Sequence, residues 1–220
     1  MTKTNGHHMN GHGRSKAGRS GPPVIGLTGG IGAGKSTVAE MLEGLGCFVV
    51  NSDALAHAAL RDAEVIATLV SWWGDSILDA SGGLDRRAIA SIVFAEASER
   101  RRLERLVHPW IEARRRELFA SAPADTRALV IDAPLLLEAG LDRECEAVIF
   151  VDANASVRLE RVGASRGWSV EDLHRREQSQ MPLDEKRARA DHTIVNEGDR
   201  SSLKKRVQET LDDILAAMDA

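Results

Sequence analysis

Five short runs of consecutive apolar residues occur along the chain, and each is bounded by polar or turn-forming residues. Strands of a parallel sheet that is covered on both faces show this continuous pattern, whereas half-exposed strands alternate apolar and polar positions. Stretches with helical spacing separate the runs. The pattern predicts an α/β fold in three layers, with a five-stranded parallel sheet between helices. The predicted strands are Pro23–Thr28, Cys47–Val50, Ala128–Ile131, Ala147–Val151 and His192–Val195.

Helical patterns fill the connections between these runs. One follows the first strand, with apolar residues at helical spacing from Ser36 to Leu45 and Gly46 at its end. A longer one contains His108-Pro109, and the proline predicts a break there. The last begins at about Ser202, and we interpret it as an ordinary packing helix. Its apolar stripe consists of Leu203, Val207, Leu211, Ile214, Leu215 and Met218.

Two connections are much longer than a parallel crossover requires. Over seventy residues separate the second and third strands, and about forty separate the fourth and fifth. About a dozen residues are enough for a crossover. We therefore expect each of these connections to have a function of its own.

Composition narrows the class of protein. The 220 residues fit one α/β domain with insertions. The formal net charge of −4 argues against nucleic-acid binding, which favours a basic face. No apolar run approaches the roughly 20 residues of a membrane span, so no membrane partner is expected. Cys47 and Cys145 lie in apolar surroundings; we expect neither a disulfide nor a zinc site, and a reducing, cytoplasmic setting.

Residues 1–23 differ in composition from the rest. They contain four cations and no acid, are rich in Gly, Ser, Asn and His, and have no apolar periodicity. Such a segment buries too little surface to offset its ordering entropy, so we expect a disordered tail outside the fold. His7, His8 and His12 are metal-ligand types, but we interpret three histidines in such a tail as incidental.

A glycine-rich motif follows the first predicted strand and precedes a helix. Residues 29–36 read GGIGAGKS, which matches GxxxxGK[ST]. Glycine lets the backbone N–H groups of such a loop turn inward around a phosphate chain, and the N-terminus of the following helix also faces the phosphates. Lys35 is expected at the β- and γ-phosphates and Ser36 at Mg²⁺. The alternative is a Gly-rich turn with a solvated lysine. The expected ATP-binding residues of the loop are Gly30, Ile31, Gly32, Ala33, Gly34, Lys35, Ser36 and Thr37.

Two carboxylates follow predicted strands. Ligand sites in open α/β sheets lie beyond the carboxyl ends of the strands. Asp132 ends the third strand and is a candidate to bind Mg²⁺ through water, with a turn or capping aspartate as the equal alternative. Asp53 follows the second strand and is a candidate to accept the proton of an attacking hydroxyl. Its alternative is the N-cap of a helix over Ala54–Leu60.

The long connections suit a phosphoryl-transfer enzyme, which needs an acceptor-binding lobe and a lid that excludes water. The second connection is dense in cations. We interpret most of them as a solvated helical face, with one or two placed to close on the transferred phosphoryl group; spacing does not say which. These cations are Arg158, Arg161, Arg166, Arg175, Arg176, Lys186, Arg187 and Arg189.

From Val24 onward the chain resembles the dephospho-coenzyme A kinase family. Each matching segment is short, but their order and spacing together are specific. The matches are GLTGGIGAGKSTVA at 26–39, VVNSDALA at 49–56, WGDSILDASGGLDRRAI at 73–89, LVHPWI at 106–111, APLLLEAGL at 133–141, RLER at 158–161, and Gln180, Arg187, Ala190, Asp191 and Asn196.

The resemblance implies a P-loop kinase core at 24–53, 128–154 and 190–220, a helical coenzyme-A-binding lobe at about 54–127 and a lid at about 155–189. It also implies the reaction: ATP phosphorylates the ribose 3′-hydroxyl of dephospho-CoA to give CoA and ADP, the last step of coenzyme A biosynthesis. The expected cofactor is Mg²⁺. The expected partners are these two small molecules, with a monomer or weak homo-oligomer.

Residue roles carried over from the family concern both substrates. Asp53 takes the position of the general base, which makes it catalytic together with Lys35 and Arg161, the lid arginine. Asn196 is expected near the adenine of ATP. The acceptor-side motifs contain Arg86, His108, Pro134 and Leu135.

The chain departs from the family pattern at two places. The family usually has Asp-x-Asp after the second strand, and here the segment reads Asn51-Ser52-Asp53. The first acid is therefore replaced, while the second remains. The spacing from Arg161 to Arg166 is one residue longer than usual, which makes Arg166 a weak match.

Two other functions compete with this one. The first is a different small-molecule P-loop kinase, acting on a nucleoside, a nucleotide or a sugar acid; the segments at 84–86, 106–111 and 133–138 speak against it. The second is a nucleotide-dependent switch without transfer chemistry. A GTPase would carry an Asn-Lys-x-Asp motif, which is absent from the chain, and a pure binder has no need of a base and a lid.

Overall fold

The computed structural model describes residues 21–218. The three histidines and nearly all of the predicted disordered tail lie outside these residues. The chain divides into two compact units, one formed by residues 51–122 and the other by the residues on either side of them. Each unit is described by itself.

The larger unit contains a five-stranded sheet in the order β2-β3-β1-β4-β5. β1 lies in the middle and pairs in parallel with β3 and β4, and β4 pairs in parallel with β5. All five strands predicted from continuous apolar runs are confirmed, and their boundaries differ by one residue at most. The strands are β1 (Val24–Gly29), β2 (Phe48–Asn51), β3 (Leu129–Asp132), β4 (Ala147–Asp152) and β5 (His192–Val195).

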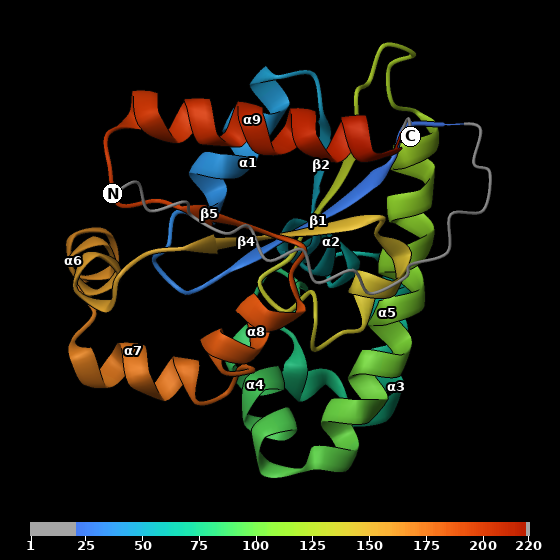
Figure 1. The fold of residues 1–220 in the computed structure, drawn as a ribbon. Coiled ribbons are helices and arrows are strands. Elements are labelled where there is room, and N and C mark those ends of the chain that lie inside the picture. The colour runs from blue at the N-terminus through green and yellow to red at the C-terminus, as the bar shows by residue number, and fades with distance from the viewer. Residues whose placement is uncertain (1–20, 219–220) are drawn as a thin grey trace, which may run out of the picture. The chain divides into compact units, whose positions relative to one another are not determined.

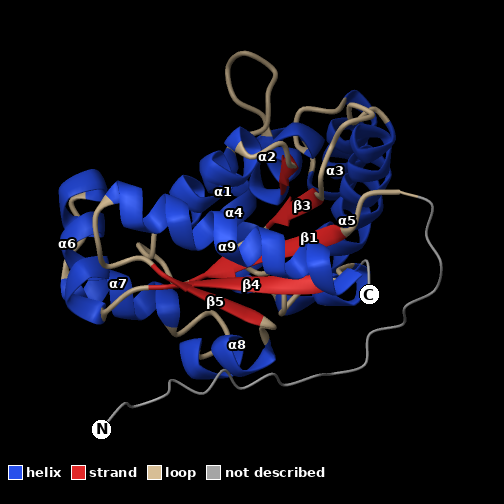
Figure 2. Cartoon of the chain, turned by 45° about the horizontal axis from the view of Figure 1, so that its top comes forward, coloured by secondary structure: helices blue, strands red, loops and turns tan. Residues whose placement is uncertain are grey.

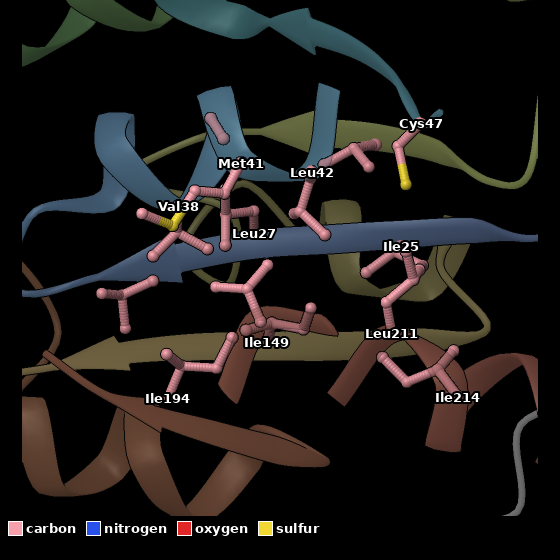
Figure 3. Close-up of a cluster of buried hydrophobic side chains, with 14 of the residues drawn as sticks. Ile25, Leu27, Val38, Met41, Leu42, Cys47, Ile149, Ile194, Leu211 and Ile214 are labelled. Carbon is pink, nitrogen blue, oxygen red and sulfur yellow. The ribbon is translucent and has the colours of Figure 1, made fainter. Parts of the chain in front are cut away.

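Helices cover both faces of this sheet. α1 (Lys35–Gly44) and α9 (Arg200–Met218) pack against each other on one face (Figure 1). α8 (Leu183–Arg189) lies on the opposite side of β4 and β5 (Figure 2). Apolar side chains from the strands meet those of α1 and α9 in the core (Figure 3). Those labelled in the close-up include Ile25, Leu27, Val38, Leu42, Ile149, Ile194, Leu211 and Ile214.

Two further helices follow β4. α6 (Ala155–Arg166) and α7 (Val170–Glu177) are joined by a turn that contains Trp168. The guanidinium carbons of Arg166 and Arg176 lie 4.8 and 4.0 Å from the centre of the Trp168 ring. Cation–π contacts of this kind stabilise the turn between the two helices.

The smaller unit is helical. Its helices are α2 (Ser52–Ala59), α3 (Ala63–Trp73), α4 (Arg86–Ala95) and α5 (Ala97–Ala120), with a short 3₁₀ turn, η1 (Asp75–Ile77). Its core is built on Val65, Leu69, Ile77 and Ile89. Both α2 and α4 pack against α5.

The break predicted at His108-Pro109 is wrong, because α5 continues through Pro109. Proline removes one backbone N–H donor from the helix interior. Leu106 and Trp110, on either side of it, pack against the core of the smaller unit. This packing holds the helix together at a position where local preference favours a break.

Cys47 and Cys145 are both buried, and no disulfide joins them. Burial raises the pKa of the Cys47 thiol to about 11, because the low-dielectric interior disfavours a thiolate. Within residues 21–218, no helix combines the length and apolar character needed to cross a membrane.

A close approach between β1 and β4 generates a prediction about stability. A Cβ added to Gly29 would lie 2.7 Å from the backbone oxygen of Val151, and backbone paired in a sheet has little freedom to move. Gly29→Ala is expected to lower the free energy of unfolding by about 1–3 kcal/mol, measured by urea denaturation. Gly44→Ala is the matched control, because nothing lies within 4 Å of the added Cβ, and it is expected to stabilise by up to about 1 kcal/mol. Equal stability of the two variants would contradict the prediction.

Candidate active site

The glycine-rich loop connects the end of β1 to the start of α1 at the middle of the sheet. Gly32 and Gly34 have φ values of 78° and 89°, in the left-handed region that favours glycine. A Cβ at Gly34 would lie 2.2 Å from Nδ2 of Asn196, so steric space also demands glycine there. No side chain caps the N-terminus of α1, and its first turn has no acid. The helix end therefore keeps the positive partial charge that suits a phosphate.

Lys35 and Asp132 form an ion pair at the carboxyl ends of the strands. Asp132 is the last residue of β3, the neighbour of β1, and is 2% exposed. The structure thus brings together the P-loop lysine and the candidate carboxylate, although 97 residues separate them in the sequence. The ion pair holds both side chains in place at the end of the strands.

Ser36 and Thr37 follow Lys35 in the first turn of α1. Ser36 is exposed, so its hydroxyl lies on the accessible side of the helix. That hydroxyl fits a magnesium ligand, since Mg²⁺ prefers oxygen and keeps waters and substrate phosphates as its other ligands. Over the same residues no group of three His, Cys, Asp or Glu side chains could hold a metal by itself.

Arg161 and Asn196 converge on one carbonyl of the P-loop. Arg161, from α6, donates from Nη1 to the Ala33 oxygen at 3.2 Å and from Nη2 to the Asn196 backbone oxygen at 3.0 Å. Asn196, which follows β5, donates from Nδ2 to the same Ala33 oxygen at 2.8 Å and is 5% exposed. Arg161 and Asn196, which the resemblance places in the lid and near the adenine, thus bind the same loop residue, Ala33.

Arg158 is a further P-loop contact that the sequence did not single out. Its Nε donates to the Ala153 oxygen at 3.1 Å, its Nη1 lies 3.4 Å from the Ile31 oxygen, and it pairs with Glu177 of α7. Its place one helical turn before Arg161, on the same side of α6, was the available signal. The interpretation as a solvated face is wrong for Arg158. It is also wrong for Lys186, which is fully buried.

The remaining cations of the second long connection are exposed, as the sequence suggested for most of them. Arg175 pairs with Asp172, Arg187 with Asp152 and Asp184, and Arg189 with Asp142. Arg166 and Arg176 lie against Trp168.

Asp53 is exposed in the first turn of α2 and does not cap that helix. The cap is Asn51, whose Oδ1 accepts a hydrogen bond from the Ala54 N–H at 2.8 Å. The helix therefore begins at Ser52, two residues before the predicted start. The capping alternative for Asp53 is wrong, and its carboxylate remains available for another role.

The remaining candidate residues are divided between the two units. Arg86, the first residue of α4, and His108 on α5 are exposed in the smaller unit with Asp53. Pro134 and Leu135 follow β3 in the larger unit with the P-loop. The Pro134 oxygen accepts the Thr28 hydroxyl at 3.2 Å and the Lys186 ammonium at 2.9 Å. Leu135 is 45% exposed.

Comparisons with known proteins agree with this geometry. The family model of dephospho-CoA kinase matches residues 23–202. A dephospho-CoA kinase from Syntrophotalea carbinolica is 40% identical over 197 residues, 89% of this chain and 90% of that protein. The solved structure of TT1252 from Thermus thermophilus superposes with a TM-score of 0.78 at 35% identity, over 90% of this chain and 98% of that one. Shikimate kinase from Acinetobacter baumannii, at 18% identity, shares the fold with a TM-score of 0.51, over 89% and 94% of the two chains.

The family match spans most of the described chain and includes the P-loop, helices α6 to α8 and the segment after β3. The relative from Syntrophotalea carbinolica adds high coverage of both proteins. The chain therefore belongs to the dephospho-CoA kinase family.

Proposed function

We propose that this protein transfers the γ-phosphoryl group of ATP to the ribose 3′-hydroxyl of dephospho-CoA, giving CoA and ADP in the last step of coenzyme A biosynthesis. The observation that carries the proposal is the P-loop, with its Lys35–Asp132 pair, inside a chain of this family. We further propose a cytoplasmic enzyme, a monomer or weak homo-oligomer, without nucleic-acid or membrane partners.

The loop residues Gly30 to Gly34 hold the phosphates of ATP through backbone N–H groups, with Thr37 following at the start of α1. Lys35 places its ammonium on the β- and γ-phosphates, where charge moves in the transition state. Ser36, and Asp132 through water, would hold Mg²⁺, which would neutralise phosphate charge. Asp132 also orients Lys35, because the two side chains are already paired.

Asp53 accepts the proton of the attacking hydroxyl. The 3′-oxygen forms a bond to the γ-phosphorus while the bond from that phosphorus to the bridging oxygen breaks, and ADP leaves with the electron pair. The proton passes to a carboxylate oxygen of Asp53. Support comes from its exposure and from its release from capping by Asn51.

Arg161 and Asn196 contact the nucleotide. Arg86 and His108 of the smaller unit, and Pro134 and Leu135 of the larger unit, each contact the acceptor. The guanidinium of Arg161 has five N–H donors, and only some of them form hydrogen bonds to Ala33 and Asn196. The remaining donors can bind phosphate oxygens in a planar arrangement.

A coupled assay of ADP release tests the function. Dephospho-CoA is expected to be the preferred acceptor over a nucleoside, a nucleotide and a sugar acid, each supplied with ATP and Mg²⁺. Lys35→Ala is the matched negative control and is expected to lower turnover by several orders of magnitude without unfolding the protein. Another acceptor used with higher kcat/KM would replace the proposed substrate. Nucleotide binding with no transfer to any acceptor would indicate a switch.

Arg161 generates a prediction about the lid. Arg161→Ala is expected to lower kcat/KM for ATP by at least about tenfold, since it removes charge-assisted hydrogen bonds. Arg161→Lys is expected to rescue poorly, because one ammonium does not reproduce the planar fork. Steady-state kinetics with ATP varied measure both effects. Arg175→Ala, a change of an exposed cation in α7, is the control, and an Arg161→Ala enzyme as active as this control contradicts the role.

A substitution at Asp53 tests catalysis separately from ATP binding. Asp53→Asn keeps the size of the side chain but accepts no proton, and it is expected to lower kcat at least about a hundredfold. ATP affinity and the thermal midpoint are expected to change little, since Asn51 caps α2. Asn51→Ala is the matched control and is expected to lower the free energy of unfolding by about 1 kcal/mol. If kcat of Asp53→Asn stays within a few-fold of the parent enzyme, the base lies elsewhere.

A further inference from the structure

Lys186 is fully buried in a helix whose other charged residues are exposed. A buried ammonium is unfavourable unless acceptors replace the lost water. Here the ammonium donates hydrogen bonds to the Pro134 oxygen at 2.9 Å and to Oε1 of Gln180 at 3.2 Å. It also forms an ion pair with Oε1 of Glu138 at 2.9 Å, so two hydrogen bonds and an opposite charge replace the lost water.

These acceptors connect parts of the chain that are distant in sequence. The Pro134 oxygen also accepts the Thr28 hydroxyl at the end of β1. Glu138 also accepts the Met181 N–H at 2.9 Å. Lys186 therefore joins the segment after β3 to the turn between α7 and α8, at the edge of the sheet that holds the P-loop.

The bond to Lys186 also determines how Gln180 presents its amide. An ammonium only donates, so the amide oxygen of Gln180 faces Lys186. What remains for a ligand is the NH₂ group, for which the described residues offer no hydrogen-bond acceptor. Gln180 lines a cavity of about 370 Å³ between α7 and α8, together with His174, Gln178 and apolar side chains.

The cavity lies on one side of the P-loop. Leu183 lines it and approaches Gly30 closely, 3.3 Å from the position of an added Cβ. Arg161 and Asn196 instead bind Ala33, further along the loop. The segment that Lys186 holds contains Pro134 and Leu135, the acceptor-side residues, with Leu135 45% exposed.

We propose that Lys186 is a positioning residue of the acceptor site: it fixes Gln180 so that its NH₂ group donates a hydrogen bond to dephospho-CoA from the wall of this cavity. The inference rests on the proposed function and adds this cavity and two residues to it. Lys186 itself does not touch the substrate, because it is fully buried.

The test compares the KM values of the two substrates in Lys186→Met, Gln180→Leu and the double variant. Each single change is expected to raise the KM for dephospho-CoA by about tenfold, as loss of a well-placed hydrogen bond does, with the KM for ATP within twofold of the parent value. Because Lys186 acts through Gln180, the double variant is expected to be no worse than the more affected single variant. Arg175→Met, an exposed cation on α7, is the control with unchanged constants.

Thermal midpoints accompany the kinetics, because Lys186→Met leaves Glu138 with one partner fewer. Should that variant not fold, Gln180→Leu, which keeps the Lys186–Glu138 pair, decides the proposal through its KM for dephospho-CoA. Unchanged KM values, an equal rise for ATP, or effects that multiply in the double variant would overturn the inference. A parent enzyme that phosphorylates another acceptor but not dephospho-CoA would overturn the proposed function as well, which separates the two failures.

Discussion

A phosphate-binding loop turns backbone N–H groups inward, and this leaves carbonyl groups that point back into the protein. Buried carbonyl groups need donors, because an unsatisfied one costs about as much as a lost hydrogen bond. Asn196 and Arg161 supply donors to the Ala33 oxygen, and Arg158 lies near that of Ile31. A phosphate-binding loop at this position therefore depends on cationic and amide side chains behind it. Helix α6 supplies the two arginines, and the segment after β5 supplies the asparagine.

The cations of residues 158–189 differ in what they bind. Arg158 and Arg161, on the loop side of α6, donate to backbone oxygens, whereas the exposed Arg175 and Arg187 pair with acids. Exposed ion pairs contribute little to stability. Buried cationic side chains instead hold neighbouring segments in place, because acceptors on several sides determine their rotamers. Lys186 belongs to the second kind and extends the same principle to the segment after β3.

Much of the fold was predictable because its strands are buried on both faces and read as continuous apolar runs. The P-loop was predictable because its spacing and its place between strand and helix are physically demanding. The partners of Arg158 and Lys186 were not predictable. Glu177, Ile31 and Pro134 lie 19, 127 and 52 residues away, and two of these contacts are to backbone oxygens that carry no sequence signal. The break predicted at Pro109 was wrong for a related reason. Packing of Leu106 and Trp110 in the smaller unit outweighs the local preference of proline to end a helix.

The need to satisfy backbone hydrogen-bonding groups also explains Asn51, which replaces the first acid that the family usually has. An N-cap needs a short side chain with an oxygen that accepts from the first turn, and asparagine serves as well as aspartate. Asn51 does this through Oδ1 and the Ala54 N–H. The change removes one negative charge close to Asp53. Asp53 thus loses a repulsive neighbour relative to the family pattern while the start of α2 keeps its cap. Asp53, the proposed base, is therefore the acid that remains in residues 51–53. It does not cap α2, the helix that carries it.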